Sequence, residues 1–352
     1  MASTASTQSD SPRMGQVLVR RTVISLAVVV VVAVPYVLFA LLSGQWAAAS
    51  WTMMGGITGL VGLLLGGRVV AYLGMGLLAV LTPLSILAGG VPVLGAALMA
   101  LMCVGVGLSA ARGLSRGTLM LPVLMASMLI APPSWSGQTV DRTTPSYLLW
   151  MTLFLAGGAL WANLVFPRLL RGRAPSRAAA SNRSDIVAYT VIITVLCAFS
   201  TLGVLIWRPG SQGSWLVVTL LVVTEVGHQD TLNRAWRRVI GTVGGALIAS
   251  IIASNTDSEL ALLTIGVILL VIAGVIRQGP HYGLYMAFMT PAVVLFSSSS
   301  IATVGKTDAQ RVAFTLIGAA LVLLASGIAV AWAHYQQTHP EPDAGQYAAV
   351  NP

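Results

Sequence analysis

The chain has 352 residues, of which 56% are hydrophobic and only 8% are charged. Its mean hydropathy is +0.86, whereas about a quarter of the residues of soluble globular domains are charged. This composition excludes a water-soluble enzyme and indicates an integral membrane protein. Twelve spans of roughly 20 residues would leave about 110 residues for tails and loops, which is too few for a separate soluble domain.

Twelve apolar runs follow one another along the chain, and we expect each to be helical. In chain order they are Thr22–Leu42, Trp46–Leu65, Val69–Ala88, Val91–Ala110, Gly117–Ala131, Tyr147–Phe166, Ile186–Trp207, Ser214–Val226, Val239–Ser254, Leu260–Ile276, Tyr282–Phe296 and Val312–His334. Some runs, such as Ser214–Val226, are shorter than a full crossing, as broken helices would be. The sequence therefore predicts an all-α, polytopic integral membrane protein with about 12 transmembrane helices.

The basic residues predict the orientation of these spans. With the N-terminus inside the cell, 15 of the 19 Lys and Arg residues fall in inner loops, and the outer side receives only Arg142, Arg208, Lys306 and Arg311. Loops that stay in the cytoplasm are enriched in Lys and Arg. We therefore predict a multi-pass protein of the cell membrane with both termini in the cytoplasm. Because the +9 net charge lies in short loops between spans, the lipid bilayer is a predicted partner and nucleic acid is not.

A short Arg-rich segment divides the chain into two similar halves. The sequence predicts a disordered cytoplasmic tail over residues 1–21, a first six-helix repeat over 22–167, a linker over 168–185, a second six-helix repeat over 186–335 and a cytoplasmic tail over 336–352. The strongest internal match aligns Arg68 to Leu78 with Arg238 to Ile248. An even number of crossings per half gives both halves the same orientation, so we predict parallel repeats, a plan that many transporters share.

Small residues and prolines mark positions where spans meet or break. Gly55 and Gly59, and likewise Gly241 and Gly245, stand four apart, a spacing that lets two helix backbones approach closely in lipid. These glycines favour helix packing, and they fit an interface between the repeats or between copies of the chain in a homo-oligomer equally well. Thr290-Pro291 lies inside a predicted span, where the proline frees a backbone carbonyl. A binding cavity and a simple kink both explain that position.

Four segments of the second half carry a family resemblance. They are Ser214–Glu225, Thr231–Leu247, His281–Pro291 and Gln310–Leu321. Over roughly Ser214–Ala331 the chain resembles the membrane domain of fusaric acid resistance proteins and aromatic acid exporters, in which an Arg is followed by Gly-Thr and a further Gly, here Arg238, Gly241, Thr242 and Gly245. The resemblance implies secondary export of small organic acids.

The first half departs from the family pattern. Ala71-Tyr72 stands where the second half has Gly-Thr, and the linker of about 18 residues is too short for the large cytoplasmic region of many family members. This departure leaves the substrate and any envelope partners open.

The candidate substrate site combines cations with the motif residues. A carboxylate inside the cell needs a cationic group at the inner mouth, and Arg offers a planar, bidentate match. Arg68 and Arg238 occupy equivalent places just before predicted helix starts, where the helix dipole also favours anions. The alternative interpretation is that they only hold their loops inside the cell. The predicted substrate-binding residues are Arg68, Arg238, Gly241, Thr242, Thr290 and Pro291.

Proton coupling needs a group that gains and loses charge within the field of the membrane. Glu225 ends an apolar span, and His228 and Asp230 follow in the same predicted loop, facing Arg234, Arg237 and Arg238. Glu225 is therefore the candidate coupling carboxylate. The alternative is a carboxylate at the membrane interface that only pairs with those arginines.

Catalysis, a metal site and a cofactor are not predicted. The histidines have no paired spacing, Cys103 and Cys197 have no metal-ligand spacing, and Gly305-Lys306-Thr307 lacks the earlier glycine of a phosphate-binding loop. We predict a secondary transporter that exports a small organic acid anion, aromatic acids included, and is coupled to the proton gradient. The alternative is a non-transporting membrane scaffold that organises envelope or lipid machinery and has no central polar cleft.

Overall fold

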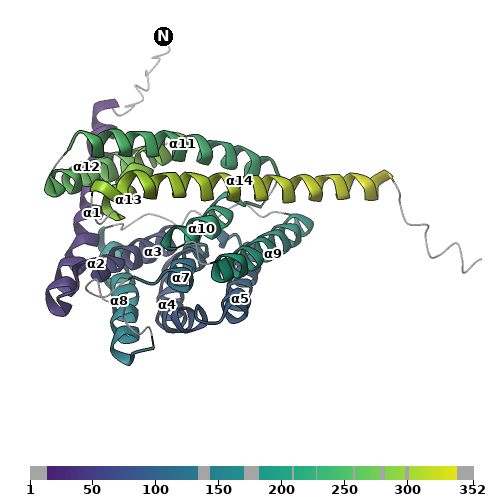
Figure 1. Ribbon diagram of the computed structural model, residues 1–352, viewed down its shortest axis with the longest axis horizontal. Coiled ribbons are helices and arrows are strands. Elements are labelled where there is room, and N and C mark those ends of the chain that lie inside the picture. Colours follow the sequence, from purple (N-terminus) through teal and green to yellow (C-terminus); the bar gives the residue numbers. More distant parts are fainter. Residues whose placement is uncertain are drawn as a thin grey trace, which may run out of the picture. The chain divides into compact units, whose positions relative to one another are not determined.

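The computed structural model describes residues 14–133, 143–169, 182–207, 210–226, 228–256, 258–277, 282–297 and 301–338. These residues form helices and connecting turns and contain no strand, so the all-α prediction is confirmed for the described ranges (Figure 1). In chain order the helices are α1 (Met14–Ser43), α2 (Trp46–Ala49), α3 (Trp51–Gly66), α4 (Arg68–Ala88), α5 (Pro92–Ala110), α6 (Ser115–Thr118), α7 (Met120–Ile130), α8 (Pro145–Leu169), α9 (Arg183–Trp207), the 3-10 helix η1 (Ser211–Gly213), α10 (Ser214–Val223), α11 (His228–Ser254), α12 (Glu259–Arg277), α13 (Tyr282–Ser297) and α14 (Ile301–Thr338).

Each predicted apolar run contains a helix. Within the described ranges, seven helices are long and apolar enough to cross a membrane, and they lie in α1, α4, α5, α8, α9, α11 and α14. Five shorter apolar helices of 10–17 residues account for the remaining runs, and a full crossing needs about 20 residues. The chain is therefore a multi-pass membrane protein. Twelve complete crossings in two parallel repeats remain a prediction.

Several helices begin earlier than their apolar runs. α1 begins at Met14, α11 at His228 and α14 at Ile301, ahead of the predicted starts at Thr22, Val239 and Val312. The added segments are more polar than the runs that follow them but contain no proline, and backbone hydrogen bonding continues through polar residues as well as through apolar ones. The start of an apolar run indicates where side chains leave water, and in these three cases the helix begins before that point.

Arg68 and Arg238, which the internal repeat aligns, differ in their positions relative to the starts of their helices. Arg68 is the first residue of α4, directly after Gly67 with φ of 84°, so its predicted place at a helix start is confirmed. Arg238 lies in the interior of α11, which begins at His228. The prediction that Arg238 stands just before a helix start is therefore wrong, because His228 to Arg237 continue the helix without glycine or proline.

Two compact units make up the chain. The smaller unit combines Met1–Ala33 with Ile240–Asp308, and the larger unit combines Val34–Val239 with Ala309–Pro352. The larger unit thus holds the last part of α1, helices α2 to α10, the first part of α11 and most of α14. The predicted linker lies largely outside the described residues, between α8 and α9. The predicted domain boundaries remain predictions.

Helices α3, α4, α5, α7, α8, α9 and α10 form the core of the larger unit. α8 packs against α3 and α4, α5 packs against α9, and α10 packs against α7 and α9 (Figure 1). Fully buried side chains at the centre of this packing include Met99, Met125, Phe154, Ile193 and Leu220. This packing brings α6 and α7 of the first half close to α10 of the second half.

α3 and α8 cross with their backbones in contact, because each helix has a glycine at the crossing. A Cβ atom on Gly55 would lie 2.0 Å from the carbonyl oxygen of Leu155, and one on Gly158 would lie 2.0 Å from that of Thr52. Next to this crossing, Asn163 Nδ2 of α8 donates a 3.0 Å hydrogen bond to a backbone carbonyl of α4. These contacts tie α8 to α3 and α4.

In the smaller unit, α11 approaches α13 at two glycines. A Cβ atom on Gly241 would lie 2.5 Å from Met286 Cβ, and one on Gly245 would lie 2.7 Å from Thr290 Cβ and 2.9 Å from Pro291 Cδ. The close approach that the glycine spacing predicts is therefore present, and the partner of α11 at these positions is α13.

A pair of adjacent glycines tests this packing. Gly245→Ala places a methyl group against Thr290 and Pro291, whereas the Cβ of Gly244 would have nothing within 4 Å. We expect Gly245→Ala to destabilise the protein by about 1–3 kcal/mol, as overpacking does. Gly244→Ala should leave stability unchanged or raise it slightly, because alanine favours a helix. Thermal unfolding of the two purified variants in detergent checks this, and equal melting temperatures would contradict it.

Candidate functional site

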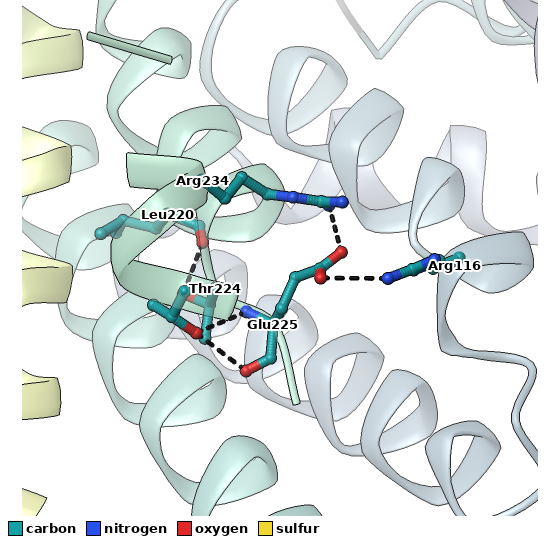
Figure 2. A network of polar contacts seen from close by, with 6 residues as sticks. Arg116, Leu220, Thr224, Glu225 and Arg234 are labelled. Carbon is teal, nitrogen blue, oxygen red and sulfur yellow. Dashed lines mark hydrogen bonds and ion pairs between the residues drawn. The ribbon is translucent and has the colours of Figure 1, made fainter. Parts of the chain in front are cut away.

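Between α10 and α11 the chain leaves the helical conformation at Thr224, whose φ and ψ are −69° and 122°. The hydroxyl of Thr224 donates to the carbonyl of Leu220 at 2.8 Å. Thr231 Oγ1 accepts a hydrogen bond from the N–H of Glu225 at 3.1 Å and donates to the carbonyl of Glu225 at 3.0 Å. Thr231 thus holds both the N–H and the carbonyl of Glu225 (Figure 2).

The carboxylate of Glu225 lies between two guanidinium groups (Figure 2). Arg116 Nη2, from α6, lies 3.1 Å from Oε2, and Arg234 Nη1, from α11, pairs with Oε1. The Glu225 side chain is 11% exposed, against 25% for Arg234 and 55% for Arg116. Each carboxylate oxygen therefore has its own cation, and one of the two cations is open to the surroundings.

A third element contributes to this ionic site. Tyr189 of α9 is buried and lies within electrostatic reach of both Glu225 and Arg234. The side chains of His228 and Asp230, which the sequence placed beside Glu225, lie outside the described side chains, although both residues belong to the first turn of α11. The predicted partnership of Glu225 with arginines is confirmed for Arg234.

The predicted substrate-binding arginines belong to the larger unit and differ in environment. Arg68 is exposed at the start of α4, whereas Arg238 is only 7% exposed within α11. A buried guanidinium in an apolar helix is unusual and needs partners around it. Their predicted role in substrate binding stays a prediction.

The other predicted substrate-binding residues belong to the smaller unit. Gly241 packs against α13, and Thr290 and Pro291 lie on α13 where Gly245 meets it. Thr242 and Thr290 are buried, at 5% and 7% exposure. The structure therefore gathers these residues along one helix pair, α11 and α13.

Sequence reasoning missed Arg116 as a site residue. Arg116 was counted only among the inner loop arginines, and it is 109 positions away from Glu225 along the chain. No local pattern joins the two residues. The contact depends on the packing of α10 against α7, which follows α6 directly.

The prediction that Arg311 lies in an outer loop is wrong, because Arg311 lies within α14 with only 4% of its surface exposed. Its Cζ atom lies 3.8 Å from the ring centroid of Trp215, at the start of α10. A cation over an aromatic face is stabilised by the ring quadrupole. The sequence feature that could have indicated this contact is that Trp215 and Arg311 each stand at the start of an apolar run.

The described residues offer little for metal or redox chemistry. Among them, no group of three or more His, Cys, Asp or Glu side chains is close enough to hold a metal ion. Cys103 of α5 and Cys197 of α9 are buried free thiols that contact each other. Among the described residues, the most strongly charged cluster is formed by Glu225 with Arg116 and Arg234.

The comparison with protein families agrees with the motifs of the second half. Residues 191–325 match the family model described as fusaric acid resistance protein-like. The matched range contains all four motif segments and extends into α9, so the predicted resemblance is confirmed over this range. Glu225 and Arg234 lie inside the matched range, and Arg116 lies before it. No curated protein and no solved structure matches the chain significantly.

Proposed function

We propose that this multi-pass membrane protein is a secondary transporter that exports a small organic acid anion and couples that movement to protons. The family match supports a role in membrane transport or efflux. Fusaric acid is an aromatic carboxylic acid, so aromatic carboxylates are the first class of substrate to test. On the arginine distribution, we place both termini in the cytoplasm.

The observation that carries this proposal is the carboxylate of Glu225 between Arg116 and Arg234. An ionisable group next to an apolar helix bundle is the usual mark of an ion or substrate pathway. In this proposal Glu225 is the group that binds and releases the coupled proton. Arg68 and Arg238 attract the anion, and Gly241, Thr242, Thr290 and Pro291 belong to the path that the anion follows.

Efflux from preloaded cells tests the proposal. Cells with and without the gene are loaded with radiolabelled benzoate, other aromatic acids and aliphatic acids, and the loss of label is followed after dilution. We expect faster loss of at least one acid from the cells that carry the gene. Benzamide, which has the shape of benzoate but no charge, should leave both kinds of cell at the same rate.

Equal efflux of every acid from both kinds of cell would contradict the transporter proposal. That result would favour the scaffold alternative, because a scaffold needs no path for an anion.

A further inference from the structure

We infer that Arg116 and Arg234 form a carboxylate-binding site that Glu225 occupies while it is ionised. A carboxylate ligand takes the place of the Glu225 side chain when Glu225 is protonated. This inference rests on the proposed function and names the substrate group that the site would recognise. The three residues all belong to the larger unit.

The geometry is that of a bound carboxylate. Arg116 Nη2 lies 3.1 Å from one oxygen of the carboxylate, and Arg234 Nη1 pairs with the other oxygen. Planar guanidinium groups are the preferred partners of carboxylates in proteins. The side chain of Glu225 therefore sits where the carboxylate of a substrate would make the same contacts.

The site is accessible to a ligand on one side. Arg116 is 55% exposed and Arg234 is 25% exposed, whereas Glu225 is 11% exposed. The backbone of Glu225 is held by Thr231, so in this inference the side chain rotates away from the arginines while the backbone stays in place. A ligand can reach Arg116 first and then displace the side chain of Glu225 from Arg234.

The charges give the sign of the effect of pH. Among the described side chains, those that interact electrostatically with Glu225 are Arg116 from α6, Arg234 from α11 and the phenol of Tyr189 from α9. With Glu225 ionised, its carboxylate pairs with both arginines, and a ligand carboxylate must compete with it. With a proton on one oxygen, Glu225 is neutral and no longer competes as an anion with a ligand carboxylate at Arg116 and Arg234.

Proton binding and anion binding therefore favour each other. Because such coupling is reciprocal, a bound carboxylate raises the proton affinity of Glu225 by the same factor by which the proton raises carboxylate affinity. The loaded site holds one anion and one proton, and the empty site holds neither. A transport cycle built on this site moves the anion and the proton together, so it suits export of acids that reactions inside the cell produce.

Equilibrium binding of radiolabelled benzoate to the purified full-length protein tests the site. Benzoate stays ionised above about pH 5, because carboxylic acids titrate near about pH 4. We expect wild-type affinity to be higher at mildly acidic than at neutral pH. Glu225→Gln should bind tightly at both pH values, because glutamine does not compete for the guanidinium groups as an anion.

Variants of the two arginines locate the binding site. Arg116→Gln and Arg234→Gln should each weaken benzoate binding about ten-fold or more, the loss expected for a charged hydrogen bond. Arg112→Gln and Arg237→Gln are matched controls, because both arginines are exposed and close in sequence to the site, and both should bind as wild type does. Arg116→Lys and Arg234→Lys keep the charge and should show an intermediate loss.

Three results would overturn the inference. They are the same affinity for Arg116→Gln and Arg234→Gln as for their controls, the same pH dependence for Glu225→Gln as for wild type, and no saturable benzoate binding at any pH. If the binding test fails while preloaded cells still export acids, the site is wrong and the proposed function stands. If binding follows the prediction while efflux is absent, the proposed function is wrong.

Discussion

Gly158→Ala should prevent the larger unit from reaching its native packing. A methyl group at position 158 of α8 would lie 2.0 Å from the carbonyl oxygen of Thr52 and 3.0 Å from the backbone nitrogen of Gly56 in α3. These are backbone atoms, so the clash is relieved only if the two helices move apart. We expect a loss of about 3 kcal/mol or more, at the upper end of what overpacking costs.

The yield and melting temperature of detergent-purified protein measure this effect. Gly105→Ala is the matched control, because Gly105 lies in α5 and a Cβ atom there would have nothing within 4 Å. The control should be as stable as wild type or slightly more stable. Gly55→Ala, on the opposite helix, should fail as Gly158→Ala does. If Gly158→Ala melted together with Gly105→Ala, the close crossing of α3 and α8 would be wrong.

Glu225→Gln should make transport sensitive to voltage. In the wild type, the empty site with ionised Glu225 and the loaded site with a proton and an anion carry the same net charge, so the cycle moves no net charge. Glutamine cannot release a proton, so each benzoate then crosses as a lone charge. One charge moved through 100 mV corresponds to about 2.3 kcal/mol. A membrane potential of this size would therefore strongly change the driving force for benzoate efflux through Glu225→Gln.

Proteoliposomes preloaded with benzoate measure this change. A potential that is negative inside should speed benzoate efflux through Glu225→Gln several-fold and leave efflux through the wild type unchanged. Asp185→Asn is the matched control, because it removes an exposed carboxylate in the first turn of α9. It should behave as wild type does. The same response to voltage in Glu225→Gln and in wild type would exclude Glu225 as the coupling group.

Hydropathy predicts where helices lie in this chain better than where they begin. Each of the twelve apolar runs contains a helix. The start of α11 could not be read in this way, since His228 to Arg238 are mostly polar yet continue the helix. For that reason Arg238 was expected at a helix start and lies inside α11 as a buried residue.

The candidate site was only partly predictable from the sequence. Glu225 stands out because carboxylates are scarce in this chain, which has 10 acidic residues, and one at the end of an apolar run is costly to desolvate. Arg234 is close to Glu225 in sequence and was named with it. Arg116 comes from the other half of the chain, and only tertiary packing brings it to Glu225.

The same reasoning explains the misplacement of Arg311. Counting basic residues for orientation treats any arginine at the edge of an apolar run as a loop residue. Arg311 instead remains helical and stacks on Trp215 of α10. The glycine pattern was more informative, because close helix approach needs small residues whichever helix is the partner. The pattern predicted the contacts of Gly55 and Gly241, but not their partners, α8 and α13.

Proton movement during benzoate efflux tests most directly the claim that one acid anion leaves together with one proton. Proteoliposomes with the wild-type protein, a pH-sensitive dye and benzoate inside are diluted into buffer without benzoate, and protein-free liposomes give the baseline. The interior should become more alkaline as benzoate leaves, faster than the baseline. Benzoate efflux with an unchanged interior pH, or with protons moving inward, would contradict the coupling of the anion to Glu225.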